Sequence, residues 1–303
     1  MIGRAVTGHA VIGRATAIVL MSRPPQLALV ASVALLGASL ARARGANPDP
    51  VHLLVGIGLL LMVAASIHLA NEFADHETDA RTRRTPFSGG SGTLPRTGLP
   101  PQLALHAAVV ALVGGIAVAV AAFAAGVVSG AALLLLAAGA IGGWAYSAGP
   151  FPLAWHGIGE VDNALLGGML LPLYGVALAG GALDLTAVAA FCPLALVVGA
   201  NLLATTWPDR DADASVGKRT LATRWPTGRL RAAYAIVIGA ALVLLAAQAV
   251  GPGPLVVAVA GLTVAPLLLV GLATYTRIES PLATVAAMLW LIGAQLLAWL
   301  SAG

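Results

Sequence analysis

Nine long apolar stretches, separated by shorter polar segments, run through most of the sequence. Each stretch is about 20 residues long, which is the length an α-helix needs to cross the hydrocarbon core of a bilayer. The pattern therefore predicts an all-α polytopic membrane protein with nine transmembrane helices. The expected spans are residues 26–43, 51–70, 102–123, 128–148, 158–181, 185–207, 230–250, 254–275 and 281–301.

The composition excludes the main alternatives to a helical membrane protein. Hydrophobic residues make up 59% of the chain and charged residues only 9%, whereas soluble domains carry about 25% charged residues. A disordered chain would need the opposite balance, with high charge and few aliphatic side chains. The apolar stretches are also too continuous for the short alternating strands of a transmembrane barrel.

The distribution of basic residues predicts the orientation in the membrane. The two longest polar segments, at about 71–101 and 208–229, each follow an even-numbered span and so lie on one side. That side carries 14 of the 16 Lys and Arg residues, and the other side carries only Arg42 and Arg44. Because basic residues concentrate in cytoplasmic loops, we expect both segments to be cytoplasmic, in the cytoplasmic membrane of a prokaryote. Basic residues confined to such loops give no reason to expect a nucleic-acid partner.

The chain is expected to form one folded domain with an N-terminal extension. Residues 1–25 carry Arg4, Arg14 and Arg23 among apolar residues, which predicts an interfacial helix or a disordered tail. Residues 26–303 are predicted to form a single transmembrane domain.

Two acidic motifs lie where spans enter the long polar segments. Asn71, Asp75 and Asp79 are spaced four residues apart, so on a helix they would form one stripe. Asp209 and Asp213 follow 134 positions after Asp75 and Asp79 with the same spacing. This offset indicates an internal repeat, whose two halves would face each other across a central cavity that opens to the cytoplasmic side.

The clustered carboxylates need positive partners, because like charges four residues apart repel each other, most strongly near a membrane. Oxygen ligands without cysteine suit Mg²⁺, which joins carboxylates to phosphate oxygens. The predicted metal ligands are Asn71, Asp75, Asp79, Asp209 and Asp213. The alternative interpretation is a pair of solvated helix ends whose charges bind nothing.

The two motifs resemble the signatures of the UbiA superfamily of intramembrane prenyltransferases. The first motif runs from Asn71 through Asp75 to Asp79. The second motif is followed by Gly-Lys-Arg-Thr-Leu-Ala at residues 217–222. The loop at 146–160 is similar to that of the dihydroxynaphthoate prenyltransferases of menaquinone synthesis. Two segments differ from those enzymes, namely Thr-Thr-Trp-Pro at residues 205–208 and the loop at 85–92, which resembles another branch of the superfamily.

The resemblance implies Mg²⁺-dependent transfer of a prenyl group from a polyprenyl diphosphate to an aromatic quinone precursor or another lipophilic acceptor within the membrane. It implies that the diphosphate lies between the motifs. The implied diphosphate-binding residues are Asn71, Lys218, Arg84, Tyr146 and Arg23. The implied catalytic residues are Asp75, Asp79, Asp209, Asp213 and, as a base, Glu160.

Several of these residues also have simpler explanations. Lys218 and Arg84 satisfy the basic bias of cytoplasmic loops, Tyr146 suits the aromatic belt of a membrane interface, and Glu160 suits the start of a helix. Two other functions stay open: a UbiA-type terpene cyclase, which lacks an external acceptor, and a transporter with acidic ion sites. Carboxylates at helix ends, rather than near the bilayer midplane, favour an enzyme over a transporter.

Overall fold

The computed structural model describes residues 13–82, 84, 85, 87 and 89–303. In these residues all regular structure is helical, and nine helices are long and apolar enough to cross a membrane. This confirms the nine expected spans, whose boundaries lie within four residues of those predicted. The nine are α2 (Pro24–Ala43), α3 (Pro50–Ala74), α6 (Gln102–Ala124), α7 (Gly130–Ser147), the continuous segment Gly159–Leu178, α10 (Leu185–Thr206), α13 (Thr227–Gln248), the segment Leu255–Thr274 and α16 (Leu282–Ala302).

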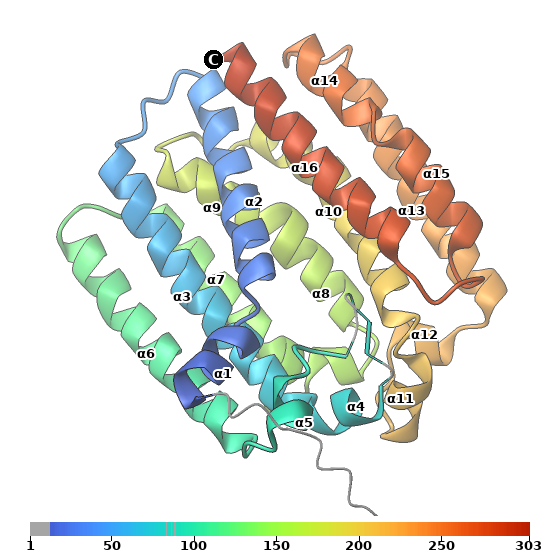
Figure 1. Cartoon of the computed structure of the whole chain (residues 1–303). Helices are drawn as coiled ribbons and strands as arrows, with labels where there is room; N and C mark the ends of the chain where they lie inside the picture. The colour runs from blue at the N-terminus through green and yellow to red at the C-terminus, as the bar shows by residue number, and fades with distance from the viewer. Residues whose placement is uncertain (1–12, 83, 86, 88) are drawn as a thin grey trace, which may run out of the picture.

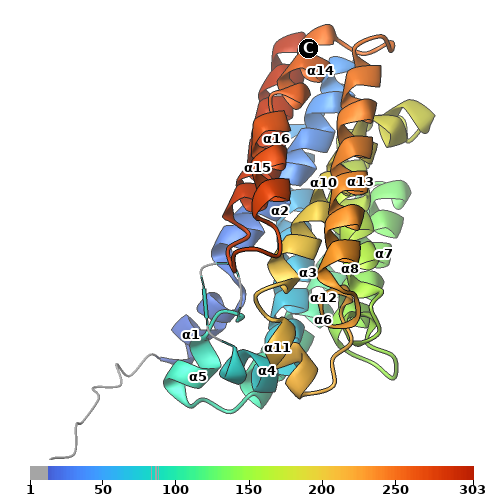
Figure 2. The ribbon, with the colours of Figure 1, turned by 90° about the vertical axis from the view of Figure 1, so that its right-hand side faces the viewer.

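The nine helices run side by side as a bundle, and the short helices collect at one end of it (Figures 1 and 2). These short helices are α1 (Arg14–Met21), α4 (His76–Arg81), α5 (Thr93–Thr97), α11 (Arg210–Ser215) and α12 (Leu221–Arg224). We call this the motif end, because both acidic motifs lie there. The C-terminus lies at the opposite end (Figure 1). The bundle thus places residues that are far apart in sequence around one end of the molecule.

The first helix, α1, falls in the predicted N-terminal extension. Its buried side chains, Ala17 and Met21, pack against Leu69 of α3 and against Ala104 and Ala108 of α6. Of the sequence features considered above, Arg4 lies outside the described residues, as do Pro86 and Ser88 in the loop at 85–92.

Close approach of backbones holds the centre of the bundle together. A Cβ added at Gly37 of α2 would lie 1.8 Å from the carbonyl oxygen of Pro172, and one added at Gly175 would lie 1.8 Å from that of Ala34. Small residues permit such contact between membrane helices, where van der Waals packing is a main source of association. Next to this contact, the buried hydroxyl of Tyr174 donates a hydrogen bond of 2.7 Å to the carbonyl oxygen of Gly56 in α3.

Two predicted spans depart from a regular α-helix, the fifth through a π-helical turn and the eighth through a break. The fifth consists of α8 (Gly159–Leu165), a π-helical turn at η2 (Leu166–Leu170) and α9 (Leu171–Leu178). The eighth consists of α14 (Leu255–Leu262) and α15 (Ala265–Thr274), and the helix breaks just before Pro266. A proline lacks the N–H that would continue the helical ladder and clashes with the preceding turn. Hydropathy alone could not show either feature, because apolar residues continue through both.

Candidate active site

The first acidic motif spans a break between two helices. We expected Asn71, Asp75 and Asp79 on one helix, but α3 ends at Ala74 and α4 begins at His76. The ladder nevertheless continues, because the Asp75 amide donates to the Asn71 carbonyl (2.9 Å) and the Asp79 amide donates to the Asp75 carbonyl (2.8 Å). The three residues therefore keep their four-residue helical spacing.

The second motif repeats this arrangement. Asp209 precedes the six-residue helix α11 as Asp75 precedes α4, and the Asp213 amide donates to the Asp209 carbonyl at 2.8 Å. The two short helices lie in contact, and Arg81 of α4 donates to the Ser215 hydroxyl of α11 at 3.3 Å. The four-residue spacing seen in the sequence thus corresponds to two similar helix ends placed next to each other.

A cavity of about 390 Å³ lies between the two motifs. We call it the acidic cavity. Of the predicted site residues, those that line it are Arg23, Asn71, Asp75, Asp79, Tyr146, Asp209, Asp213 and Lys218. The structure therefore brings both acidic motifs, two basic residues and Tyr146 to one cavity. Several other polar residues also line it, to which the sequence analysis gave no role in the site, namely Gln26, Asn163, Thr205, Thr206 and Thr220.

Lys218 connects the two motifs. Its Nζ lies 3.1 Å from Asp75 Oδ1 and 3.6 Å from Asp213 Oδ1, and its side chain is 8% exposed. Burial disfavours the charged ammonium, but the two carboxylates outweigh this effect and raise the pKa of Lys218. For Asp213, burial outweighs the attraction of Lys218 and raises the pKa to about 6.

The turn after α11 sets the position of Lys218. Gly217 has a φ of +83°, a left-handed conformation that glycine adopts without steric cost. The amides of Gly217 and Lys218 donate to the carbonyls of Ala214 and Asp213, as in a Schellman motif that ends a helix. The chain therefore turns back immediately after α11 and returns Lys218 to Asp213.

Arg23 approaches the first motif from the N-terminus of α2. Its Nη2 donates to Asn71 Oδ1 at 3.0 Å and to Glu72 Oε2 at 3.1 Å. Its Nε is buried and has no hydrogen-bond partner among the described residues. Arg23 also has a φ of +56°, which is uncommon for a residue with a side chain and typical of functional sites. Arg23 therefore offers an unused donor at the edge of the acidic cavity.

Glu72 connects this helix end to the glycine-rich loop at 89–92. It is 2% exposed, and it accepts hydrogen bonds from the amide of Ser91 (3.1 Å) and from the Ser91 hydroxyl. Asn71 donates to Asp75 Oδ2 at 2.8 Å and to the Ser147 hydroxyl at 2.9 Å. Adjacent residues thus have different roles, since Asn71 orients a carboxylate of the cavity and Glu72 secures the loop beside it.

Asp79 lies directly against the glycine-rich loop. A Cβ added at Gly90 would lie 1.9 Å from Asp79 Oδ2, so only glycine leaves room for this carboxylate. Burial, together with repulsion from Asp75, raises the pKa of Asp79 to about 7. The loop therefore holds Asp79 in a position where its negative charge is poorly compensated by the protein.

Glu160 and Arg84 do not line the acidic cavity as the structure stands. Glu160 is buried, and its Oε1 accepts a hydrogen bond of 2.8 Å from the Leu221 amide at the start of α12. Its Oε2 is buried and has no hydrogen-bond partner among the described residues. Arg84 is exposed, and its guanidinium packs over Gly92. The structure thus places Glu160 against the start of α12, outside the acidic cavity, and Arg84 on the exposed side of the glycine-rich loop.

The acidic cavity has the charge and the donor atoms for a hard cation. Four aspartates and two basic side chains line it, so the lining carries two net negative charges when all groups are ionised. Burial raises the pKa values of Asp79 and Asp213, so a bound cation would stabilise the ionised forms of these carboxylates. In the described part of the chain, no three His, Cys, Asp or Glu side chains converge closely enough to hold a metal ion. Asp75 and Asp213 contact Lys218 instead, so binding a metal requires these side chains to rearrange.

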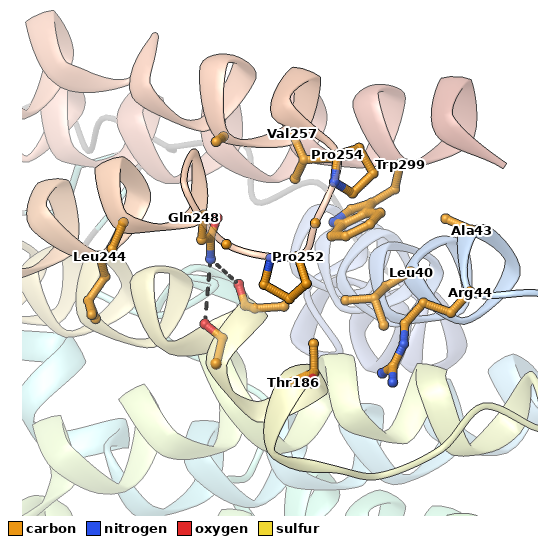
Figure 3. A pocket seen from close by; sticks show the side chains of 16 residues that line it. Leu40, Ala43, Arg44, Thr186, Leu244, Gln248, Pro252, Pro254, Val257 and Trp299 are labelled. Atoms are coloured by element: carbon orange, nitrogen blue, oxygen red, sulfur yellow. Dashed lines mark hydrogen bonds between the residues drawn. The ribbon is translucent and has the colours of Figure 1, made fainter.

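A larger cavity, of about 720 Å³, lies between α2, α10, α13, α14 and α16, at the end of the bundle where Figure 1 places the C-terminus. Figure 3 shows it from close by. Its lining is mainly apolar, with Leu40, Val257 and Trp299 on its walls, and Arg44 is its one charged lining residue. Gln248 turns its amide to the backbone of α10 and donates to the carbonyls of Ala189 (3.4 Å) and Ala190 (3.1 Å) (Figure 3). This cavity has no carboxylate among its lining residues, so it does not offer the chemistry of the acidic cavity.

The fold and the paired motifs define a class of nine-helix membrane proteins with an acidic cavity at one end of the bundle. The sequence model described as "UbiA prenyltransferase family" matches residues 30–300. The chain therefore belongs to the UbiA prenyltransferase family. A search of curated proteins finds no significant match.

Solved structures share the fold across almost their whole length. A UbiA homologue from Archaeoglobus fulgidus bound to GPP and Mg²⁺ has a TM-score of 0.67 at 16% identity, covering 94% of this chain and 99% of that one. Digeranylgeranylglyceryl phosphate synthase has a TM-score of 0.65 at 16% identity, covering 96% and 98% of the two chains. The apo UbiA homologue from Aeropyrum pernix K1 has a TM-score of 0.64 at 18% identity, covering 92% and 97%.

Proposed function

We propose that this protein transfers a prenyl group from a prenyl diphosphate to a lipophilic acceptor, with Mg²⁺ bound in the acidic cavity. The observation that carries the proposal is that two acidic motifs far apart in the sequence meet around one cavity, with Lys218 between them. The GPP and Mg²⁺ bound to the homologue from Archaeoglobus fulgidus support the same donor class and metal.

The proposed metal ligands are the carboxylates of Asp75, Asp79, Asp209 and Asp213, with the side-chain oxygen of Asn71. Mg²⁺ bound there would neutralise the charge that develops on the leaving diphosphate. Arg23 and Lys218 would donate N–H groups to phosphate oxygens, which form strong charge-assisted hydrogen bonds. The buried Nε of Arg23 supports this role, because a phosphate oxygen would give it the partner that it lacks among the described residues.

The chemical step breaks the allylic C–O bond of the donor, and the electron pair leaves with the diphosphate. An electron-rich atom of the acceptor then forms the new bond to the allylic carbon, and its proton passes to a carboxylate of the first acidic motif. The chain's own part is to orient the diphosphate, with Tyr146 as a further proposed donor to it. The cavity wall next to the motifs also includes Ile67, Leu202 and Phe87, apolar side chains that limit access of water to the reacting carbon.

We propose an aromatic acid, such as a dihydroxynaphthoate, as the acceptor. The similarity of the loop at 146–160 supports it, and Tyr146 from that loop lines the acidic cavity. Arg224, whose Nη1 donates to the carbonyl oxygen of His156 in that loop at 3.2 Å, would give the positive charge that an acceptor carboxylate needs. Because the fold is similar to that of digeranylgeranylglyceryl phosphate synthase, a glyceryl lipid phosphate is the alternative acceptor against which the aromatic acid should be tested.

The test is an assay of the purified full chain with Mg²⁺, radiolabelled prenyl diphosphates and a panel of acceptors. The expected result is label in a prenylated acceptor, with dihydroxynaphthoate used faster than 4-hydroxybenzoate or a glyceryl lipid phosphate. Faster use of the lipid or the benzoate contradicts the acceptor but not prenyl transfer. Diphosphate release with a cyclic hydrocarbon product and no prenylated acceptor would instead identify a terpene cyclase.

We also propose that the acidic cavity faces the cytoplasm, because the motif end carries most of the basic residues. The test uses a variant whose one cysteine, Cys192, is replaced by serine. In that background Ser215→Cys, at the motif end, should react with a membrane-impermeant thiol reagent only from the cytoplasmic side. Gly126→Cys, in the exposed loop after α6, should react only from the other side. The reverse labelling pattern overturns the orientation.

A further inference from the structure

Glu72 of α3 is a buried carboxylate that has no part in the proposed chemical step. Its side chain is 2% exposed, and it does not line the acidic cavity, although its neighbour Asn71 does. Burying a carboxylate is costly unless charged or polar partners compensate for the lost water. The partners of Glu72 come from two separate segments, namely the residue that precedes α2 and the glycine-rich loop at 89–92.

The first partner of Glu72 is Arg23. Arg23 Nη2 lies 3.1 Å from Glu72 Oε2, and the same nitrogen donates to Asn71 Oδ1 at 3.0 Å. Two adjacent side chains of α3 therefore hold the guanidinium. The Nε of this guanidinium is the buried donor that has no partner among the described residues and that we assign to the diphosphate. Glu72 thus orients a group that would bind the substrate.

The second partner of Glu72 is Ser91. The Ser91 amide donates to Glu72 Oε2 at 3.1 Å, and the Ser91 hydroxyl donates to Oε1. The same hydroxyl accepts from the Thr93 amide at 3.0 Å, at the start of α5. Both oxygens of the Glu72 carboxylate are therefore engaged, and the loop is held against the end of α3.

Gly90 carries this contact on to Asp79. A Cβ added at Gly90 would lie 3.3 Å from Glu72 Oε2 and 1.9 Å from Asp79 Oδ2, so the backbone of Gly90 lies close to both carboxylates. The two hydrogen bonds from Ser91 to Glu72 fix the residue that follows Gly90. A loop held at Ser91 therefore limits where the carboxylate of Asp79 can lie.

We propose that Glu72 is a positioning residue for both parts of the site. It orients Arg23 toward the diphosphate, and through Ser91 and Gly90 it holds Asp79 where a metal ion would bind. This inference rests on the proposed function and adds a residue that acts through others rather than on the substrate or the metal itself.

The length of the Glu72 side chain matters for this role. Oε2 accepts from Arg23 and from the Ser91 amide, while Oε1 accepts from the Ser91 hydroxyl. An aspartate at this position keeps the charge but is shorter by one C–C bond, or about 1.5 Å. From the same backbone position it cannot reach both segments, so Glu72→Asp separates the positioning role from the charge.

The experiment measures metal binding without turnover, by electron paramagnetic resonance of Mn²⁺ added to the purified full chain. Glu72→Asp should raise the Kd for Mn²⁺ by about 10–100-fold, which is the usual effect of losing a residue that orients metal ligands. Loss of one charge-assisted hydrogen bond to Arg23 should also raise KM for geranyl diphosphate about tenfold at saturating Mg²⁺. Ser91→Ala should raise the Kd for Mn²⁺ but leave this KM unchanged, because Arg23 keeps its contact with Glu72.

The matched control is Glu77→Asp, the same change at an exposed position of α4 that does not line the acidic cavity. It should keep the wild-type Kd for Mn²⁺ and the wild-type KM. A wild-type Kd for Mn²⁺ in Glu72→Asp, or an equal rise in the control, overturns the inference while prenyl transfer stands. If Glu72→Asp does not fold, an unchanged Kd in Ser91→Ala overturns it instead. A wild-type chain that binds no Mn²⁺ and transfers no prenyl group contradicts the proposed function itself.

Discussion

Lys218 Nζ lies 3.1 Å from Asp75 Oδ1, although the two residues are 143 positions apart in the chain. The contact joins the loop after the second acidic motif to the centre of the first. It places a cation between the carboxylates of Asp75 and Asp213, at the position where the proposed diphosphate and metal would meet.

Replacing Lys218 should impair donor binding and turnover together. Lys218→Ala removes a charge-assisted hydrogen bond, which contributes about 1.5–3 kcal/mol. Since each 1.36 kcal/mol corresponds to a factor of ten, kcat/KM for the prenyl diphosphate should fall by about 10–100-fold. The matched control is Arg219→Ala, because Arg219 is the exposed neighbouring basic residue. Equal kinetics for the Lys218 variant and the control would show that Lys218 only anchors the loop.

Gly90→Ala should weaken metal binding by displacing Asp79. The new Cβ would lie 1.9 Å from Asp79 Oδ2, a distance that forces the carboxylate or the loop to move. We expect the Mg²⁺ concentration for half-maximal activity to rise at least tenfold, measured by titrating Mg²⁺ at a fixed donor concentration.

The control for this prediction is Gly98→Ala. Gly98 has a φ of +65°, close to the +59° of Gly90, but an added Cβ there meets nothing within 4 Å. The two variants therefore carry similar backbone strain, and only Gly90→Ala introduces the clash with Asp79. The same Mg²⁺ dependence in both would mean that the loop does not position Asp79 for a metal.

Variants of Glu160 distinguish a base from a positioning residue. Glu160→Gln removes the carboxylate but keeps an oxygen that can accept from the Leu221 amide, whereas Glu160→Ala loses both. Because Glu160 does not line the acidic cavity, we expect the Gln variant to keep kcat within about threefold and the Ala variant to lose at least tenfold. A loss of 100-fold or more in the Gln variant, with normal thermal stability, would instead support the predicted role as base.

Gly175→Ala should destabilise the bundle without involving the site. Its Cβ would lie 1.8 Å from the backbone oxygen of Ala34, and a backbone cannot rotate away as a side chain can. Overpacking of this kind costs about 1–3 kcal/mol, so the melting temperature in detergent should fall by several degrees. Gly239→Ala in α13 meets nothing within 4 Å and should melt at the wild-type temperature or slightly higher. Equal melting temperatures would show that α2 and α9 can separate at no cost.

Local sequence patterns were enough to predict the nine spans and both motifs. A helix that crosses a membrane requires a continuous apolar run of known length, and four-residue spacing places side chains on one face. Both rules involve neighbours along the chain. Both motifs therefore lie at the ends of long apolar helices, as the sequence predicts. The break between α3 and α4 at Asp75 was not predicted, but the first motif keeps its helical spacing across it.

Contacts between distant segments were decided only by the tertiary structure. The packing of the helices puts Lys218 against Asp75, Arg23 against Asn71, and Gly90 against Asp79. Glu160 and Arg84 were both predicted to belong to the site. Helix packing places Glu160 against the start of α12, and the course of the loop leaves Arg84 exposed over Gly92, so neither lines the acidic cavity.

The sequence by itself thus determined which residues are apolar enough to span the membrane and which polar residues recur at helical spacing, because hydropathy and helical periodicity are local properties. The tertiary structure decided which charges become partners across the acidic cavity. Those features depend on how closely helices approach and how their side chains interdigitate, which no single segment encodes.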